Sequence, residues 1–203
     1  MRLEELAERE GANITIEWKT FLLRPEPEER SMEQFVEYTK SWERPAEMEP
    51  RAPFFWPWSG LNEPPAFSVP AAVAGKAAET FGDDVWHRFH RRLLEAYFVE
   101  NRTVSDVGVL TSVAVAVGID GDAYRTVFNE QGPDLTQRVL DEHHEALQRG
   151  VNGVPAVVVD DRYLISGAVD VDHYVAALAR YREILSEESA AAEQIDDPST
   201  TAT

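Results

Sequence analysis

The sequence contains no cysteine among its 203 residues. This absence excludes disulfide bonds, thiolate zinc sites, iron–sulfur clusters and a cysteine nucleophile for these residues. The chain is nevertheless long enough to bury a hydrophobic core without such cross-links. We therefore expect either one domain with an insertion or two small domains, held together by packing.

Basic residues are also scarce. The chain carries 19 Lys plus Arg against 37 Asp plus Glu, which gives a formal net charge of −18. Only Lys19, Lys40 and Lys76 are lysines. Binding to nucleic acid depends on clustered Lys and Arg that contact phosphates, so we expect no nucleic-acid partner. A surface rich in carboxylates instead stays hydrated and repels other copies of itself.

The sequence also lacks long hydrophobic runs. No segment approaches the ~20 apolar residues that a membrane-spanning helix requires. Residues 1–6 read Met-Arg-Leu-Glu-Glu-Leu, which is acidic and amphipathic and lacks the apolar run of a signal peptide. We therefore expect a soluble, cytoplasmic protein with no membrane partner.

The first 30 residues contain one helical and one extended pattern. Residues 1–10 place Leu and Ala at helical spacing among charged residues, and Gly11 follows as a stop signal. Residues 13–23 alternate apolar and polar side chains before they become wholly apolar, which predicts a strand. The two prolines in residues 24–27 end that strand, because proline lacks a backbone donor and restricts its neighbour.

Residues 31–149 have the composition of a helical subdomain. Ser31 is the candidate N-cap of the first helix. A Pro- and aromatic-rich loop over residues 50–70 follows that helix, and a loop of this length with this composition is typical of a packed, functional segment. Hydrophobic periodicity predicts helices over residues 31–48, 71–81, 84–99, 106–117, 122–129 and 133–149.

The C-terminal third changes character. Residues 154–159 form a short, β-branched apolar run that predicts a buried strand. A tight turn at Asp160-Asp161 and a second strand over residues 162–166 would complete a hairpin. A helix is predicted over residues 170–185. Residues 186–203 contain five acidic and no basic residues, so we expect this tail to be disordered.

The most specific local feature is the run Gly-Val-Asn-Gly-Val-Pro at residues 150–155. Proline is unusual at the start of a buried strand, and a Val-Pro bond there can be cis. A cis Pro155 would direct the carbonyl and amide of Val154 outward, where they could pair with an extended peptide or a thiol-linked partner. The alternative is a trans proline at an ordinary strand entry. On this basis Gly153, Val154 and Pro155 are candidate substrate-binding residues.

Three aromatic residues of the loop are the remaining binding candidates: Phe55, Trp56 and Trp58. Large exposed aromatic side chains often mark recognition surfaces, so this loop is predicted to cover an apolar groove beside the Val154-Pro155 tip. The alternative is that these side chains pack between the helical subdomain and the sheet. The residues themselves do not decide between the two interpretations.

Histidine pairs offer a possible metal site. His87 and His90 are three residues apart on a predicted helix, and His143-His144 lie in an acidic helical stretch. Such spacing can place two metal ligands on one helix face. We interpret both pairs as solvated faces of amphipathic helices, and we expect no metal site and no cofactor.

Several segments together resemble the DsbA-like thioredoxin family, and the FrnE-type members in particular. The C-terminal part is the most specific, with Gly-Val-Asn-Gly-Val-Pro-Ala-Val-Val-Val from residue 150 and Tyr-Leu-Ile-Ser-Gly-Ala from residue 163, before a helix. Upstream, Ala-Tyr-Phe at residues 96–98, followed by Val104-Ser105-Asp106, resembles the family's “AYF…disd” segment. Residues 16–23 resemble the strand that the family writes as “EWRPFEL”. The resemblance extends over nearly all of residues 1–185.

The resemblance implies an α/β fold: a thioredoxin-like domain with a large helical insertion. Residues 1–30 would supply part of its first helix and its second strand, residues 31–149 the insertion, and residues 150–185 the C-terminal hairpin and helix. The first strand and the start of the first helix, which carry the family's Cys-x-x-Cys, have no counterpart here. Val154 and Pro155 match the cis-proline loop that faces the reactive sulfur in the family. That sulfur reacts as a thiolate stabilised at a helix N-terminus, through a mixed disulfide.

Two explanations account for the missing segment: a start codon assigned too far downstream, or a genuinely shortened pseudoenzyme. We expect the first, because each unpaired buried backbone group costs about 1–3 kcal/mol and a domain has only about 5–15 kcal/mol of stability. In the chain as given, the strand over residues 13–23 should lie two strand spacings, ~9.6 Å, from residues 154–160, or should have moved into the gap. A regular sheet of four strands would contradict this reading.

The function implied by the resemblance is thiol–disulfide exchange, acting on protein thiols and disulfides or on a small thiol such as glutathione. The chain as given would be redox-inactive because it has no cysteine. One alternative is the related 2-hydroxychromene-2-carboxylate isomerase or kappa-class glutathione-transferase branch, which uses Ser in place of a cysteine pair. Another is a non-catalytic protein that binds peptides or partners. The sequence does not indicate an oligomeric state.

Overall fold

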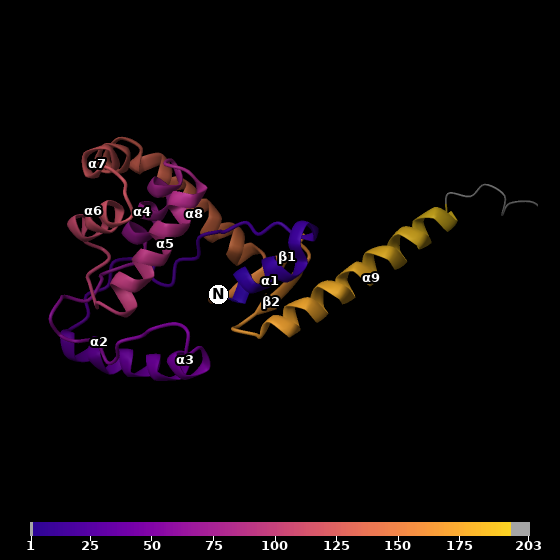
Figure 1. Cartoon of the computed structure of the whole chain (residues 1–203), viewed down its shortest axis with the longest axis horizontal. Coiled ribbons are helices and arrows are strands. Elements are labelled where there is room, and N and C mark those ends of the chain that lie inside the picture. The colour runs from indigo at the N-terminus through magenta and orange to yellow at the C-terminus, as the bar shows by residue number, and fades with distance from the viewer. Residues whose placement is uncertain (1, 196–203) are drawn as a thin grey trace, which may run out of the picture. The chain divides into compact units, whose positions relative to one another are not determined.

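The chain is divided into two compact units. The computed structural model describes the backbone of residues 2–195 and the side chains of residues 2–191. Unit 1 combines residues 1–18 with residues 151–203, and unit 2 consists of Lys19–Gly150. The chain therefore passes from one unit to the other after Trp18 and again after Gly150. Figure 1 labels the elements of each unit, which are described separately below.

Unit 2 contains helices but no strand in its part of the described chain. Each helix predicted between residues 31 and 149 is present with its ends displaced by a few residues, except that a 3-10 turn divides the first one. Ser31 is its N-cap: its hydroxyl accepts from the Gln34 amide at 3.2 Å, and the Gln34 side chain accepts from the Ser31 amide. The elements are α2 (Met32–Thr39), η2 (Lys40–Trp42), α3 (Glu43–Met48), α4 (Val69–Glu79), α5 (Asp83–Phe98), α6 (Val107–Ala116), α7 (Gly121–Glu130) and α8 (Gly132–Gln148).

The main core of unit 2 lies around α4. This helix presents Ala74, Ala77 and Ala78, all with 0 % exposure, so that neighbouring helices can approach its backbone closely. The hydroxyl of Tyr124 on α7 donates to the Ala74 carbonyl at 3.1 Å, which satisfies a polar group inside the core. Burial raises the pKa of the Tyr124 phenol, so this donor stays protonated.

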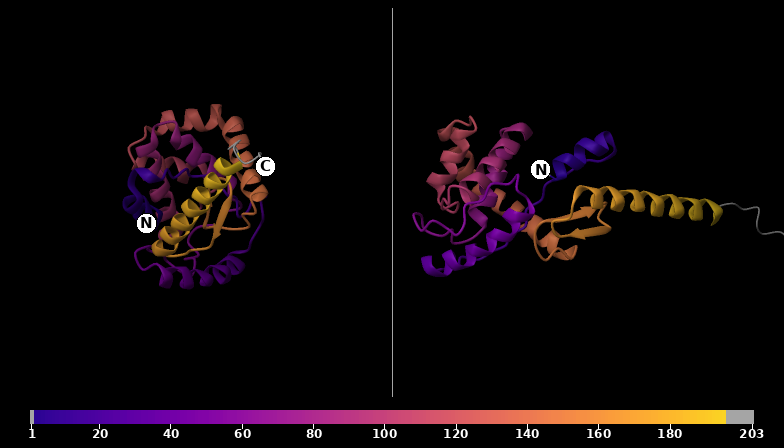
Figure 2. Two further views of the ribbon diagram at one scale, coloured as in Figure 1. Left: turned by 90° about the vertical axis from the view of Figure 1, so that its right-hand side faces the viewer. Right: turned by 60° about the horizontal axis from the view of Figure 1, so that its bottom comes forward.

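Unit 1 consists of a helix at each end of its sequence and a β-hairpin. Its elements are α1 (Arg2–Glu10), the 3-10 turn η1 (Gly11–Asn13), β1 (Ala156–Val159), β2 (Tyr163–Ser166) and α9 (Val171–Ile195). The two strands are antiparallel and pair Ala156 with Ser166 and Val159 with Tyr163, as the predicted hairpin requires. Figure 2 shows α9 beginning beside the hairpin and extending beyond it. The hairpin, α1 and α9 share a small core that includes Leu6, Ile165, Val171 and Tyr174.

Ion pairs join α1 and α9 at the surface of unit 1. Arg9 pairs with Asp172 at 2.6 Å, and Arg182 pairs with Glu10 at 2.8 Å. At the other end of unit 1, Arg162 of the hairpin turn pairs with Glu188 at 2.8 Å. That contact lies beyond the predicted helix end at residue 185. The helix continues to Ile195 because the added residues are mainly Ala and Glu, which favour helix. The rest of the predicted disordered tail, residues 196–203, lies outside the described residues.

The strand predicted over residues 13–23 is wrong. Among the described residues the sheet contains β1 and β2 alone, and residues 14–30 hold no strand. Ile14 does have extended backbone angles, with φ −136° and ψ 154°. Side chains of unit 2, rather than a partner strand, accept hydrogen bonds from the amides of Thr20, Leu22 and Arg24. The described residues form no four-stranded sheet, and the expected spacing from residues 154–160 stays a prediction.

The first division between the units falls after Trp18, and residues 20–24 bond to side chains of unit 2. The segment bounds expected for the thioredoxin-like domain, residues 1–30 and 150–185, stay a prediction. The second boundary, after Gly150, falls where the sequence changes from helical patterns to the β-branched run of the hairpin. No helix within residues 2–195 has the length and apolar character needed to cross a membrane.

Candidate functional site

The candidate site with the clearest geometry is the entry to β1. Val154 is 52 % exposed, and Gly153 is half-buried. The Val154-Pro155 peptide bond is cis, as is Trp56-Pro57. The Pro155 carbonyl accepts from the Gly167 amide at 2.9 Å, so Pro155 continues the pairing of β1 with β2.

The backbone N–H and C=O of Val154 are unpaired within the described chain. Val154 lies in a bend just before β1, outside the residues that the two strands pair. The entry to β1 thus offers one backbone donor and one acceptor beside an exposed apolar side chain.

The aromatic loop divides into buried and exposed residues. Trp58 is only 2 % exposed and packs edge to face on Phe35, at 5.1 Å between ring centroids, and on Trp42 at 6.3 Å. Its indole N–H donates to the Asn62 carbonyl at 2.8 Å. Packing inside unit 2 therefore accounts for Trp58 without a ligand. Phe55 and Trp56, at 53 % and 37 % exposure, remain available to one.

Buried polar side chains hold this loop in place. The Thr39 hydroxyl on α2 accepts from the Trp58 amide at 2.8 Å. Asn101, only 1 % exposed, accepts from the Ser59 amide at 2.7 Å and donates to the Phe55 carbonyl at 3.3 Å. These contacts fix the loop backbone. Hydrogen bonds to the backbone, rather than packing of its own side chain, therefore hold Phe55 at the surface. Whether the loop covers a groove beside Val154 stays a prediction, since the two lie in different units.

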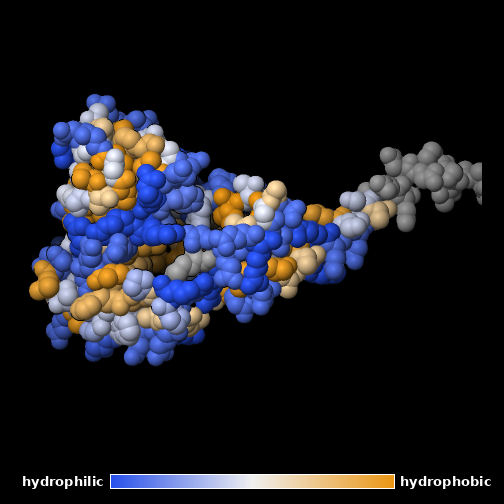
Figure 3. All heavy atoms as spheres, viewed as in Figure 1, coloured by the Kyte–Doolittle hydropathy of each residue, from blue (hydrophilic) through white to orange (hydrophobic). Residues whose placement is uncertain are grey.

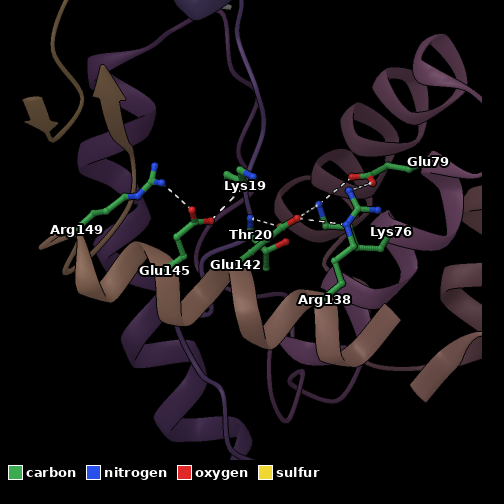
Figure 4. A network of polar contacts seen from close by, with 8 residues as sticks. All are labelled: Lys19, Thr20, Lys76, Glu79, Arg138, Glu142, Glu145 and Arg149. Atoms are coloured by element: carbon green, nitrogen blue, oxygen red, sulfur yellow. Dashed lines mark hydrogen bonds and ion pairs between the residues drawn. The ribbon is translucent and has the colours of Figure 1, made fainter. Parts of the chain in front are cut away.

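A network of charged residues, not foreseen from the sequence, is centred on Glu142 of α8 (Figure 4). Lys76 on α4 is 4 % exposed and pairs with Glu142 at 2.8 Å and with Glu79 at 2.9 Å. Arg138 joins both carboxylates, at 2.8 Å from Glu79 and 3.5 Å from Glu142. The second oxygen of Glu142 accepts from the Thr20 amide at 2.8 Å. Every oxygen of this buried carboxylate is therefore paired.

The burial of Glu142 could have been inferred from its position on α8. Leu135, Val139 and Glu142 follow one another at four and three residues, which places all three on the buried stripe of α8. Burial by itself would raise the pKa of the Glu142 carboxyl. The hydrogen bonds from Lys76 and Thr20 outweigh burial and lower the pKa below its ordinary value. The carboxylate is thus ionised at neutral pH and serves as an acceptor.

The interpretation of His143 as a solvated residue is wrong. Its side chain is 7 % exposed, and its Nδ1 accepts from the Leu22 amide at 3.2 Å. Its ring also packs edge to face on Phe21, at 5.0 Å between centroids. His144, the next residue, is exposed. The spacing of four residues from Val139 to His143 places His143 on the buried stripe of α8, whereas His144 is turned about 100° away from it, so the pattern of α8 could have separated the two.

No group of three potential metal ligands occurs among the residues that the structure describes. His90 stacks on Trp86 at 5.2 Å between ring centroids, while His87 contacts the same indole edge to face. An open groove of about 600 Å³ lies in unit 2, lined by charged side chains that include Lys19, Arg138 and Glu142. Arg138 and Glu142 of this lining belong to the ion-pair network described above, and Lys19, Asp134, Gln137, Asp141 and Glu145 complete it.

Known proteins are similar to this chain over most of its length. A solved protein from Nitrosomonas europaea has a TM-score of 0.69 at 20% identity, over 89% of this chain and 88% of its own. The cytosolic disulfide reductase DsbM from Pseudomonas aeruginosa, solved with glutathione, has a TM-score of 0.64 at 19% identity, over 93% of this chain and 91% of its own. The uncharacterised protein YwbO of Bacillus subtilis (strain 168) is 23% identical over 172 residues, 83% of each chain.

The decisive comparison is with a family model. These two solved structures are at most 20% identical to this chain, so they show its fold alone: a thioredoxin-like domain in which most residues are helical. The model of the DSBA-like thioredoxin domain matches residues 1–179, which include α1, the whole of unit 2, the hairpin and the beginning of α9. The chain therefore belongs to the DSBA-like thioredoxin domain family.

Proposed function

We propose that this chain takes part in thiol–disulfide exchange and that its 203 residues supply the binding of the thiol or disulfide substrate. The observation that carries the proposal is the unpaired backbone of Val154 beside its exposed side chain, at the entry to β1. The backbone of an extended peptide, or the peptide bonds of glutathione, can offer an acceptor to the Val154 N–H and a donor to its C=O. Gly153 and Pro155 flank these groups and complete the proposed contact surface.

The redox step itself lies outside what these residues can do. Exchange requires a thiolate that attacks a disulfide sulfur, and the sequence contains no cysteine. We therefore propose that the chain as given is redox-inactive. Glutathione is one proposed ligand because DsbM, a similar structure, was solved with it, and protein thiols or disulfides are the other. A cytoplasmic location and kinship with FrnE-type members belong to the same proposal.

Phe55 and Trp56 are proposed as additional contacts for the apolar part of a substrate. Both are exposed, and aromatic side chains contribute large contact areas at low entropic cost. Trp58 is left out of this set because its ring is enclosed in unit 2.

The binding part can be tested by NMR. Addition of oxidised glutathione, or of a short disulfide-containing peptide, should shift the amide signals of Gly153 and Val154 saturably. Val154→Asp should weaken binding of glutathione by about tenfold or more, because a new carboxylate repels an anionic ligand. Val115→Asp is a matched control, since Val115 is 54 % exposed on another unit and should leave affinity unchanged. Binding that is insensitive to Val154→Asp would overturn the assignment of the tip.

The redox part needs a separate assay. The chain should leave the rate of insulin reduction by dithiothreitol at the protein-free value, and an accelerated rate would contradict redox inactivity. Conjugation of glutathione to a chlorinated aromatic acceptor should also stay at background. Activity there would instead favour the glutathione-transferase branch.

A further inference from the structure

Residues 20–24 are attached to unit 2 through a regular alternation. The amides of Thr20, Leu22 and Arg24 each donate to a side chain: to Glu142 at 2.8 Å, to His143 Nδ1 at 3.2 Å, and to the Ser68 hydroxyl at 3.1 Å. Three side-chain acceptors thus hold every second amide of this stretch, which bends at Leu23. These three bonds hold the first segment of unit 2 after the boundary at Trp18.

The middle acceptor is the only one of the three that titrates close to neutral pH. An imidazole accepts at Nδ1 only while it is neutral, because a protonated ring carries N–H on both nitrogens. The side chain of His143 is 7 % exposed, and Leu22, whose amide it holds, is 2 % exposed. A charged His143 would therefore lose its acceptor and leave the Leu22 amide unpaired in a buried place.

The surrounding charges do not relieve that cost. On α8, His144 adds repulsion to the effect of burial, and together they lower the pKa of His143 below its ordinary value of 6.5. Glu142 is the nearest acid in sequence, but its carboxylate is already bonded to Lys76, Arg138 and the Thr20 amide. Two further acids of this region are also paired: Glu79 with Lys76 and Arg138, and Glu145 with Lys19 at 4.0 Å and Arg149 at 2.6 Å. Asp141 of α8 accepts from the Gln137 side chain at 2.8 Å.

We propose that His143 is a proton-sensitive latch, which holds the chain around Leu22 on α8 at neutral pH and loosens it in mildly acidic solution. Thr20 stays attached, because its acceptor is a carboxylate that remains ionised in that range. The loosened stretch therefore lies between two amides that stay attached, those of Thr20 and Arg24.

Proton linkage gives the direction in which pH shifts the opening of this segment. When the segment opens, His143 regains water and its ordinary pKa, so the open state binds more protons than the closed state below pH 6.5. Acid therefore favours opening, and the closed state is fully held only above that value. At about pH 5 an open-state pKa of 6.5 would multiply the open population by at most about thirtyfold.

Amide hydrogen exchange on the full chain, resolved by NMR and corrected for intrinsic rates, tests the latch. Between about pH 7.5 and about pH 5, protection of the Leu22 amide should fall about tenfold, and that of Thr20 less than about threefold. In His143→Asn, an amide oxygen can replace Nδ1 as a non-titrating acceptor, so the pH dependence at Leu22 should disappear. His144→Asn is the matched control and should preserve the dependence at Leu22.

Two results would overturn the proposal. One is equal protection of Leu22 at both pH values in the unmodified chain, which needs no variant. The other is pH dependence at Leu22 that survives in His143→Asn.

Discussion

Glu142 and Lys76 form a pair of charges inside unit 2, and both side chains are less than a tenth exposed. Such a pair pays a desolvation cost that only good geometry repays, and here Arg138, Glu79 and the Thr20 amide complete the bonding. The sequence placed Glu142 on the buried stripe of α8, but it could not identify Lys76 as the partner. That partner is 66 residues away and meets Glu142 only because α4 packs against α8.

Lys76→Met should therefore destabilise unit 2 by about 3 kcal/mol, because it leaves a buried carboxylate with Arg138 as its main counter-ion. Urea denaturation followed by tryptophan fluorescence would measure the loss. Lys40→Met is the matched control: Lys40 forms an exposed ion pair with Glu37, and its removal should change stability by less than about 0.5 kcal/mol. Equal effects of the two substitutions would contradict the buried pair.

At the scale of elements, patterns within one segment predicted more than patterns between segments. The helices of unit 2 and the hairpin have the predicted order because periodicity, caps and turns are local properties. Ser31 and the Asp160-Asp161 turn, with φ of 45° and 59°, were readable from residue type. The strand predicted over residues 13–23 is absent, because the amides of Thr20, Leu22 and Arg24 bond to side chains of α8 and to Ser68, which no local pattern reveals.

The loop between α3 and α4 gives a test at this scale. Trp58→Ala should cost about 3–5 kcal/mol in unfolding free energy, since the indole fills a core with Phe35 and Trp42. Trp56→Ala, two residues away and 37 % exposed, should cost less than about 1 kcal/mol. Thermal denaturation of the two variants would compare them directly. A Trp56 substitution as damaging as that of Trp58 would show that the loop depends on Trp56 for packing.

At the scale of the whole molecule, charge is the dominant property. The net charge of −18 is not neutralised by the ion pairs, which join residues that already count in that sum. Figure 3 shows hydrophilic residues over most of the face in view, with hydrophobic residues in separate patches. Like charges at this density repel one another in the folded state more than in an expanded chain.

Salt should accordingly stabilise the protein. Raising sodium chloride from about 20 mM to about 500 mM shortens the Debye length well below 10 Å and should raise the unfolding temperature by about 2–4 °C. Potassium chloride should give the same shift, because screening depends on ionic strength alone. A midpoint that falls with salt would mean that attractive ion pairs outweigh the net repulsion.

The sequence by itself determined the family, the order of the helices, the hairpin and the exclusion of cysteine chemistry, because these depend on residue identity and local spacing. The tertiary structure decided which polar groups are buried together. Val154 is exposed and unpaired at the entry to the hairpin, and His143 is an acceptor because the Leu22 amide lies against α8. These outcomes depend on how residues far apart in the chain pack, which sets the directions of their hydrogen bonds.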